Sequence, residues 1–445
     1  MNVEQTTLPK KYHDAVLHWQ RHNFPDYGLL PENWQKYFPS DPEFCLCAKM
    51  EVGMGDKVEV GDAKGEKRRE KPEELGEEPA KHLLAIIRAQ ASTEFGSIQQ
   101  HEGTLARAQD DEDRFWVLRV MAEELRHGYQ MFHLLVEQDW SGVSGQKAEE
   151  MVEEILSMQT GSHVLDAFNL EYDSFVDNVV FAAVIDRVGK YQLSMQRVCS
   201  YKPFAASMPP MLREEAFHLA AGVIPLRRWV QRAAQGNALI TTSAIQKAFN
   251  KWMPRGLEMF GHEKGGDSNI RFGFKNMKNA EAQSLYYDEC KRMIADLNQR
   301  FIRARLPQLS PEDAEALAGR LLSDRGKHEG ISHEDLIELP HTGFFRRKGD
   351  AAFTMVGFAG ETFTDVEEYV RHLAAHLPEP YLHSRDMKQY VESLRQVAAG
   401  TMTREQAMKK MPALKRVGGM CPCSKSVRWV MENGEDSSAS RPSAN

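Results

Sequence analysis

Two of the three Glu-x-x-His matches in this chain constrain its fold more than any other feature. The third, Glu338/His341, contains Pro340 and lies in a loop-like segment. A glutamate and a histidine stand three positions apart at Glu124/His127 and again at Glu215/His218. Residues at that spacing lie on one face of a helix, so each pair can direct two ligand atoms toward one point. Apolar residues recur around both pairs at helical spacing, which predicts that these polar side chains face the interior of a helical structure.

A single acid precedes each pair at nearly the same distance. Glu94 stands 30 positions before Glu124, and Asp186 stands 29 positions before Glu215. Both acids lie on apolar stripes of their own segments, where an unpaired carboxylate would cost several kcal/mol. The repeated placement of buried acids therefore needs one shared explanation.

Helical periodicity of apolar residues runs through four long segments of the chain. Prolines at 203, 209 and 210 are expected to separate the third segment from the fourth, because proline cannot continue a helix interior. Together the segments predict an all-α protein built on a four-helix bundle. The four expected helices are residues 81–101, 111–138, 173–200 and 209–233.

The rest of the chain is expected to extend this bundle at both ends. We expect an N-terminal arm and linker over 1–80, the bundle over 81–235, and an accessory, mostly helical region over 236–432 that shapes a substrate pocket. A polar, disordered tail is expected over 433–445. Within the accessory region, helices are expected at 280–305, 310–325 and 365–376, and short strands within 339–362.

Glu-x-x-His on two helices, with one carboxylate on each of the other two, is the arrangement of dinuclear carboxylate bundles. Four carboxylates balance the charge of two divalent ions, so the cluster can be buried as a neutral unit. Oxygen and imidazole donors suit iron or manganese, and the absence of thiolates on these faces argues against structural zinc. The alternative is a set of buried acids paired with core cations, for which Arg126 and Arg187 are the nearest candidates.

Composition excludes several other classes of protein. The chain has 445 residues and a formal net charge of −8, which argues against a nucleic-acid binder. No apolar run approaches the ~18 residues of a membrane helix, and no secretory signal is readable. Six cysteines are too few for a disulfide scaffold, so a reduced, cytoplasmic protein is expected. The roles of Cys45, Cys47, Cys421 and Cys423 stay open between ordinary thiols, a redox pair and a four-thiolate zinc site.

The bundle motifs resemble those of the benzoyl-CoA and phenylacetyl-CoA epoxidase family of ferritin-like di-iron oxygenases. The likeness is good over about residues 80–360. It is carried by residues 90–94 (QASTE), 122–127 (AEELRH), 185–193 (IDRVGKYQL), 212–218 (LREEAFH), 287–292 (YDECKR) and 339–349 (LPHTGFFRRKG).

This resemblance implies a ferritin-like fold and a role for each motif residue. One iron would be held by Glu94, Glu124 and His127, and the other by Asp186, Glu215 and His218, with Glu124 and Glu215 as bridges. Glu94, Glu124 and Glu215 would take part in catalysis. Gln90 would line the pocket or support a ligand.

The implied activity is epoxidation of the aromatic ring of an acyl-CoA thioester such as benzoyl-CoA, in aromatic catabolism, with dioxygen as co-substrate. The sequence contains neither a Gly-x-Gly-x-x-Gly turn nor a clear iron–sulfur cysteine set, so a separate flavin or iron–sulfur reductase using NADPH is implied. A basic triplet, Arg346, Arg347 and Lys348, is a candidate for the coenzyme A phosphates.

Three alternatives remain open from the sequence, one of which is a helical scaffold without metal. The same metals could hydroxylate or N-oxygenate another substrate. A non-oxygenase ferritin-like protein could store iron or generate a radical, which would need a tyrosine such as Tyr129 or Tyr191 near the metals. The chain is expected to act as a monomer or homodimer, without nucleic acid or membrane.

Overall fold

The computed structural model describes most of the first 340 residues and parts of the remainder. The described ranges are 2–24, 27–105, 108–160, 162–170, 172, 174–236, 238–261 and 267–340, with scattered later residues that include 355–356, 362–363, 399–403 and 424–433.

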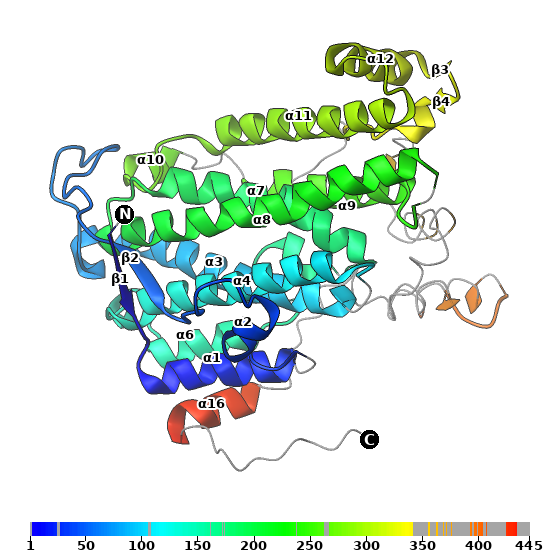
Figure 1. Ribbon diagram of the computed structural model, residues 1–445. Helices are drawn as coiled ribbons and strands as arrows, with labels where there is room; N and C mark the ends of the chain where they lie inside the picture. The colour runs from blue at the N-terminus through cyan, green and yellow to red at the C-terminus, as the bar shows by residue number, and fades with distance from the viewer. Residues whose placement is uncertain are drawn as a thin grey trace.

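Four long helices form the centre of the molecule, as expected for an all-α, ferritin-like bundle. One layer pairs α3 with α4, the other pairs α7 with α8, and α4 also packs against α8 (Figure 1). These helices are α3 (Glu77–Leu105), α4 (Asp111–Val136), α7 (Phe175–Gln196) and α8 (Lys202–Ala234).

Further helices surround the bundle, and α16 near the end of the chain packs against α1 near its start (Figure 1). They are α1 (Lys10–Asn23), α2 (Leu30–Tyr37), α5 (Ser141–Ser144), α6 (Ala148–Leu156), α9 (Thr242–Met259), α10 (Asp267–Arg271), α11 (Asn279–Arg305), α12 (Pro311–Asp324) and α16 (Ser424–Asn433), with 3₁₀ turns η2 (Pro72–Leu75), η3 (Asp166–Asn169) and η4 (His333–Asp335).

The described strands are short and lie outside the bundle. They form three antiparallel pairs: β1 (Val3–Thr6) with β2 (Ala48–Glu51), β3 (Lys327–His328) with β4 (Ile331–Ser332), and β5 (Met355–Val356) with β6 (Thr362–Phe363). The last pair confirms short strands near 339–362.

Local sequence explains where the main helices begin and end. Asp110 caps α4 by accepting a hydrogen bond from the amide of Asp113, and Ser174 caps α7 in the same way. α11 ends immediately before Leu306 and Pro307, which confirms the helix expected over 280–305. α12 confirms the helix at 310–325, whereas most of 365–376 lies outside the described residues.

The expected helix break at the double proline is wrong. α8 begins at Lys202 and runs through Pro209 and Pro210 to Ala234. Each proline removes one backbone hydrogen bond. Both prolines are buried and α8 packs extensively against α7, so burial of this apolar face outweighs the lost hydrogen bonds.

The N-terminal segment contributes to the main core. Trp19 on α1 is fully buried, and its ring packs edge-on against Phe95 of α3 at 4.7 Å between centroids. Further along, Cys45 and Cys47 are joined by a disulfide, which corresponds to the redox-pair alternative and not to ordinary thiols. The other half of the four-thiolate zinc site, Cys421 and Cys423, lies outside the described residues.

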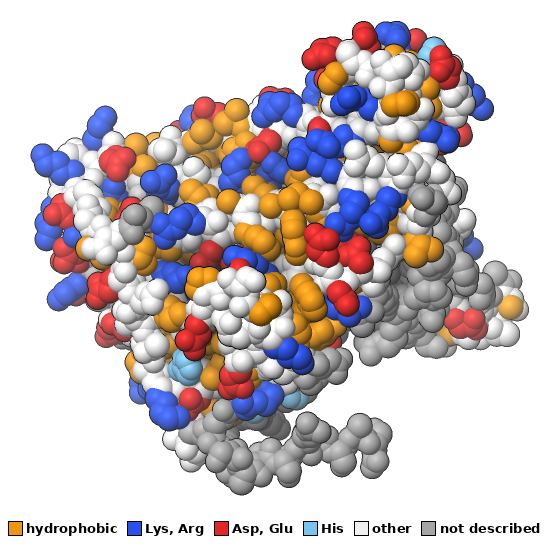
Figure 2. Space-filling view, viewed as in Figure 1, with side chains coloured by type: hydrophobic (Ala, Val, Ile, Leu, Met, Phe, Trp, Pro, Cys, Tyr) orange, Lys and Arg blue, Asp and Glu red, His pale blue; other side chains and the backbone are white. Residues whose placement is uncertain are grey.

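The surface carries both signs of charge. Figure 2 shows basic and acidic side chains interspersed around smaller apolar areas on the face in view. Among the described helices, none combines the length and apolar character that a bilayer span requires.

A buried histidine makes stability depend on pH. Nδ1 of His163 lies 3.1 Å from the Ser92 hydroxyl, its Nε2 lies 2.9 Å from the Gln99 side-chain oxygen, and burial lowers its pKa to about 4. An unfolded histidine titrates near 6.5, so between pH 6.5 and 4 the unfolded chain binds more protons. The wild type should therefore lose up to about 3 kcal/mol from this group as the pH falls through that window.

The variant His163→Gln should lack this acid-sensitive contribution. Urea unfolding at pH 7.5 and pH 5 should show the stability difference between wild type and variant shrinking by about 2 kcal/mol at the lower pH. A difference that stays constant between the two pH values would contradict the assignment.

Candidate metal centre

The six candidate ligands converge in the middle of the bundle, and each is at most 8% exposed. Each of the four bundle helices contributes at least one of them. Glu94 lies on α3, Glu124 and His127 on α4, Asp186 on α7, and Glu215 and His218 on α8.

Their ligand atoms form two groups that share one residue. Glu94, Glu124 and His127 bring one atom each within 4.8 Å of one another, and so do Glu124, Asp186 and His218. Glu124 therefore lies between the groups, where a carboxylate can offer one oxygen to each side. Glu215 joins neither triplet, but its Oε2 lies 3.5 Å from Nδ1 of His218.

Both imidazoles turn Nδ1 toward the acids. Nδ1 of His127 lies 3.6 Å from Oε2 of Glu94. Nδ1 of His218 lies 3.5 Å from Oε1 of Glu124 and 4.0 Å from Oδ2 of Asp186. These separations are too long for hydrogen bonds but suit atoms that face a common ion.

Several of these atoms are buried with no hydrogen-bond partner among the described residues. They include Nδ1 of both histidines, Oδ2 of Asp186 and Oε2 of Glu215. Unsatisfied buried polar atoms are rare, because each costs the desolvation of the group. Orphaned oxygen and imidazole nitrogen atoms that point toward one another fit divalent metal ions.

The pKa values of the buried acids also favour bound metal ions. Burial raises the pKa of Glu94 to about 7. Burial and the charge of Glu94 raise the pKa of Glu124 well above its ordinary value, and burial and the charge of Glu124 do the same for Asp186. The acids repel one another in a dry interior, a repulsion that bound cations would relieve.

The ion-pair alternative is not supported by the geometry. Arg126 turns away to Glu214, with 2.6 Å between Nη2 and Oε1, and Arg187 donates to Glu289 at 2.6 Å. Within the described part of the chain, none of the four candidate carboxylates forms an ion pair with lysine or arginine.

A second pair of acids, which the sequence analysis missed, contacts the outer sides of the histidines. Nε2 of His127 on α4 lies 3.1 Å from Glu214 on α8, and Nε2 of His218 on α8 lies 3.2 Å from Glu123 on α4. Glu214 hydrogen-bonds His127, whereas Glu123 approaches His218 closely without a hydrogen bond. The available signal was that both motifs read Glu-Glu-x-x-His, with an extra acid before the ligand glutamate.

Glu214 is held in its charged form. Although burial alone would raise its pKa, contacts with His127 and Arg126 hold the pKa well below its usual range. Lys49 adds a third contact at 3.2 Å. A carboxylate behind a histidine fixes the ring's orientation and its tautomer.

Two glycines leave room for this arrangement. A Cβ at Gly189 would lie 2.9 Å from Oε1 of Glu215, so a side chain there would collide with the carboxylate. A Cβ at Gly222 would lie 2.3 Å from the backbone nitrogen of Ala183. Gly222 therefore permits the close approach of α8 to α7 beside the site.

The remaining candidates differ in what the structure says of them. Gln90 lies one turn before Glu94 on α3, and its side-chain oxygen is buried without a partner among the described residues. The basic triplet Arg346, Arg347 and Lys348 lies outside the described residues.

The tyrosines considered for a radical have hydroxyl partners outside the ligand set. Tyr129 accepts a hydrogen bond from the amide of Leu8, and Tyr191 donates one to Glu289. Tyr172, not singled out from the sequence, has a buried hydroxyl without a partner among the described residues, and burial followed by the charge of Asp186 raises its pKa.

Comparison with known proteins places these residues in a family context. Residues 68–310 match the model of a family described as phenylacetic acid catabolic protein, a range that includes the whole of α3, α4, α7 and α8. The chain is also similar to benzoyl-CoA oxygenase component B of Aromatoleum evansii, at 24% identity over 367 residues, covering 74% of this chain and 75% of that protein.

Proposed function

We propose that this chain is the oxygenase component of a multicomponent di-iron enzyme. The premise is that the chain belongs to the phenylacetic acid catabolic protein family. Its substrate would be an aromatic acyl-CoA thioester of the benzoyl-CoA type, and its reaction the epoxidation of the aromatic ring. The observation that carries the proposal is the buried cluster in which Glu124 belongs to both ligand groups.

The chain would supply a fixed coordination geometry. Glu94, Glu124 and His127 would hold one iron, and Asp186, Glu215 and His218 the other. Two bound iron ions would provide the electrons and the reactivity toward dioxygen that side chains lack. Glu214 and Glu123 would keep the two imidazoles oriented, because each contacts the nitrogen on the far side from the site.

The bundle would also keep the site dry. All six candidate ligands are at most 8% exposed, and the fully buried rings of Phe95 and Phe181 belong to the same core. A water-excluded site protects reactive species from side reactions. The relative is named as one component of an oxygenase, and this supports a separate electron donor for this chain, for which we propose an NADPH-dependent reductase.

Two measurements test this function together. Protein produced with iron should contain about two irons per chain, as expected for a dinuclear carboxylate site. With a reductant and ¹⁸O₂, benzoyl-CoA or phenylacetyl-CoA should yield an oxygenated thioester that contains one labelled oxygen atom.

The other outcomes separate the alternatives. Iron without product from either thioester would contradict the proposed substrate and favour hydroxylation or N-oxygenation of another compound. A tyrosyl radical signal in electron paramagnetic resonance, again without product, would favour a radical-generating protein. Iron-free protein would contradict the whole proposal.

A further inference from the structure

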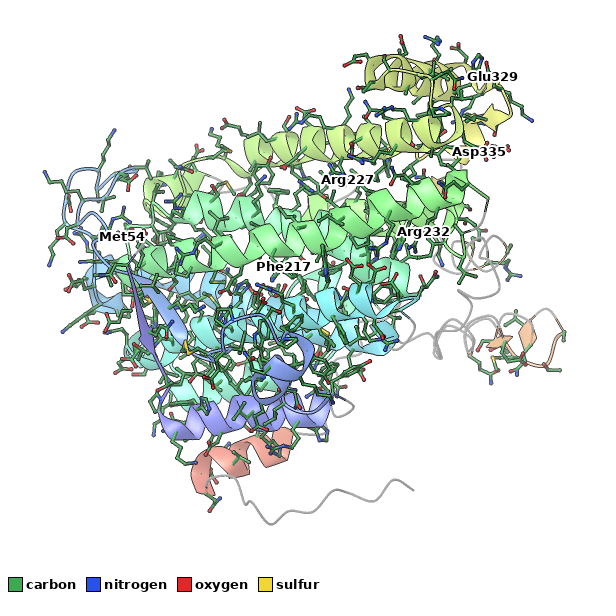
Figure 3. The ribbon with its side chains drawn as sticks, viewed as in Figure 1. Met54, Phe217, Arg227, Arg232, Glu329 and Asp335 are labelled. Atoms are coloured by element: carbon green, nitrogen blue, oxygen red, sulfur yellow. A yellow bond between two sulfur atoms is a disulfide. The ribbon has the colours of Figure 1, made fainter. Side chains whose placement is uncertain are left out.

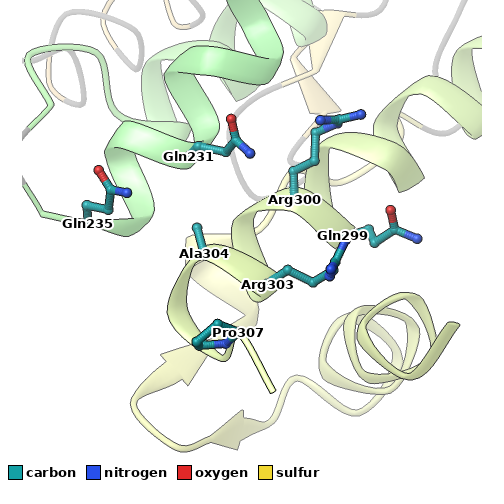
Figure 4. A pocket seen from close by; sticks show the side chains of 7 residues that line it. All are labelled: Gln231, Gln235, Gln299, Arg300, Arg303, Ala304 and Pro307. Atoms are coloured by element: carbon teal, nitrogen blue, oxygen red, sulfur yellow. The ribbon is translucent and has the colours of Figure 1, made fainter. Parts of the chain in front are cut away.

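A second site of a different chemical kind lies between α8 and α11. A pocket of about 440 Å³ opens there, within the size range of small-molecule sites. Figure 4 shows residues of both helices around it. Its lining contains two arginines, three glutamines and no acid: Gln231, Gln235, Gln299, Arg300, Arg303, Ala304 and Pro307.

Positive charge exceeds negative charge around this pocket. Asp296 is shared by Arg227, whose Nε lies 2.7 Å away, and by Arg300, whose Nε lies 3.0 Å from both carboxylate oxygens. Arg303 forms no ion pair with any described residue. Arg227 and Arg300 thus share one carboxylate, and Arg303 adds a third positive charge, on a chain whose overall charge is negative. Arg227 is labelled in Figure 3, on the side of α8 that faces α11.

Part of the lining is already held in place. Of the Arg300 side chain, only Nε contacts Asp296. The two terminal nitrogens of Arg300 therefore stay available for a ligand. Gln299 is anchored by a hydrogen bond from its amide to the Pro311 carbonyl at 2.9 Å. Groups that are ordered before binding lose less entropy when a ligand arrives.

We propose that this pocket binds a small organic phosphate. One guanidinium group can donate two parallel hydrogen bonds to the oxygens of a phosphate, so Arg300 and Arg303 would hold the phosphate. The side-chain amides of Gln231 and Gln235 would meet polar groups of the organic part, and Ala304 and Pro307 give it an apolar contact.

The pocket is separate from the metal centre. Gln231 follows His218 by 13 positions on α8, which corresponds to about 20 Å along the helix axis. His218 is fully buried, whereas Gln231 is exposed. The proposal therefore rests on this pocket alone and does not depend on the oxygenase activity.

Calorimetric titration of the full chain tests the site. The probes are AMP, free coenzyme A and inorganic phosphate, with adenosine as the phosphate-free control, all at constant ionic strength. At least one phosphate probe should bind saturably, with a Kd below about 1 mM. Adenosine should not bind. Binding of AMP would indicate a free nucleotide or similar phosphate, whereas binding of coenzyme A alone would indicate the nucleotide end of a thioester.

Charge-removing variants locate the binding. The double variant Arg300→Gln/Arg303→Gln should weaken binding at least about tenfold, and Arg303→Gln alone, which breaks no described contact, should weaken it in the same direction. Arg292→Gln is the matched control, an exposed arginine of α11 outside the pocket, and it should bind like the wild type. No saturable binding by any phosphate probe, or equal weakening in Arg292→Gln, would overturn the proposal.

Discussion

Glu124→Gln is expected to lower iron content from about two per chain to less than about one, since a neutral amide replaces the carboxylate shared by both ligand groups. The substitution keeps nearly the same size and removes only the charge. No other single change touches both groups, so the loss should exceed that of a change confined to one of them. Metal analysis of the purified variant measures this directly.

The same substitution, which is expected to weaken iron binding, should increase the folding stability of the metal-free protein. Burial and neighbouring charge raise the pKa of Glu124 in the folded chain, so at neutral pH this group costs folding free energy. Below the unfolded pKa near 4.5 the group is protonated in both the folded and the unfolded chain, and this cost is absent. Metal-free Glu124→Gln should therefore be more stable than metal-free wild type at pH 7, by about 1–3 kcal/mol, and the gain should disappear below about pH 4.

Glu112→Gln is the matched control for this experiment. Glu112 lies on the same helix, α4, and its side chain is 61% exposed. Its replacement should leave both iron content and stability close to wild type. A Glu124→Gln protein that keeps two irons, or that is less stable than wild type without metal, would contradict the role given to this carboxylate.

Gly222→Ala is expected to destabilise the chain by about 3 kcal/mol or more, because the new methyl group would lie 2.3 Å from the Ala183 backbone. The neighbouring atom belongs to a buried helix and cannot rotate away. α7 and α8 must therefore separate, and since both carry candidate ligands, iron content should fall as well.

Gly103→Ala provides the control for a helical glycine. A Cβ at Gly103 on α3 would meet no atom within 4 Å, so the alanine should leave stability unchanged or raise it by up to about 1 kcal/mol. Thermal unfolding and metal analysis of both variants measure the difference. A Gly222→Ala protein within about 0.5 kcal/mol of wild type would show that the helices do not approach as closely as described.

The parts of the fold that could be predicted are those governed by local pattern. Amphipathic periodicity gave the bundle helices, and Pro307 gave the end of α11. The continuation of α8 through Pro209 and Pro210 could not be read in this way, because it depends on the long face that α8 buries against α7. That packing energy is a tertiary quantity, and it overrides the local preference of proline.

The candidate site divides along the same line. Its six candidate ligands could be selected because acids on apolar stripes are conspicuous, and two of these acids are followed by a histidine three positions later. Glu123 and Glu214 escaped notice because each stands beside a ligand glutamate and is an unremarkable acid until the opposite helix is in place. The metal-binding roles of the six candidates, and the supporting roles of Glu123 and Glu214, stay predictions until the ions are measured.

The reciprocal contacts of α4 and α8 have a consequence for assembly of the bundle. Glu123 of α4 contacts His218 of α8, and Glu214 of α8 contacts His127 of α4. In each contact the acid of one helix meets the histidine of the other. Sliding either helix by one turn, about 5.4 Å, would break both contacts together. Polar side chains of the chain itself thus favour one register of this helix pair, in addition to any contribution from a bound metal.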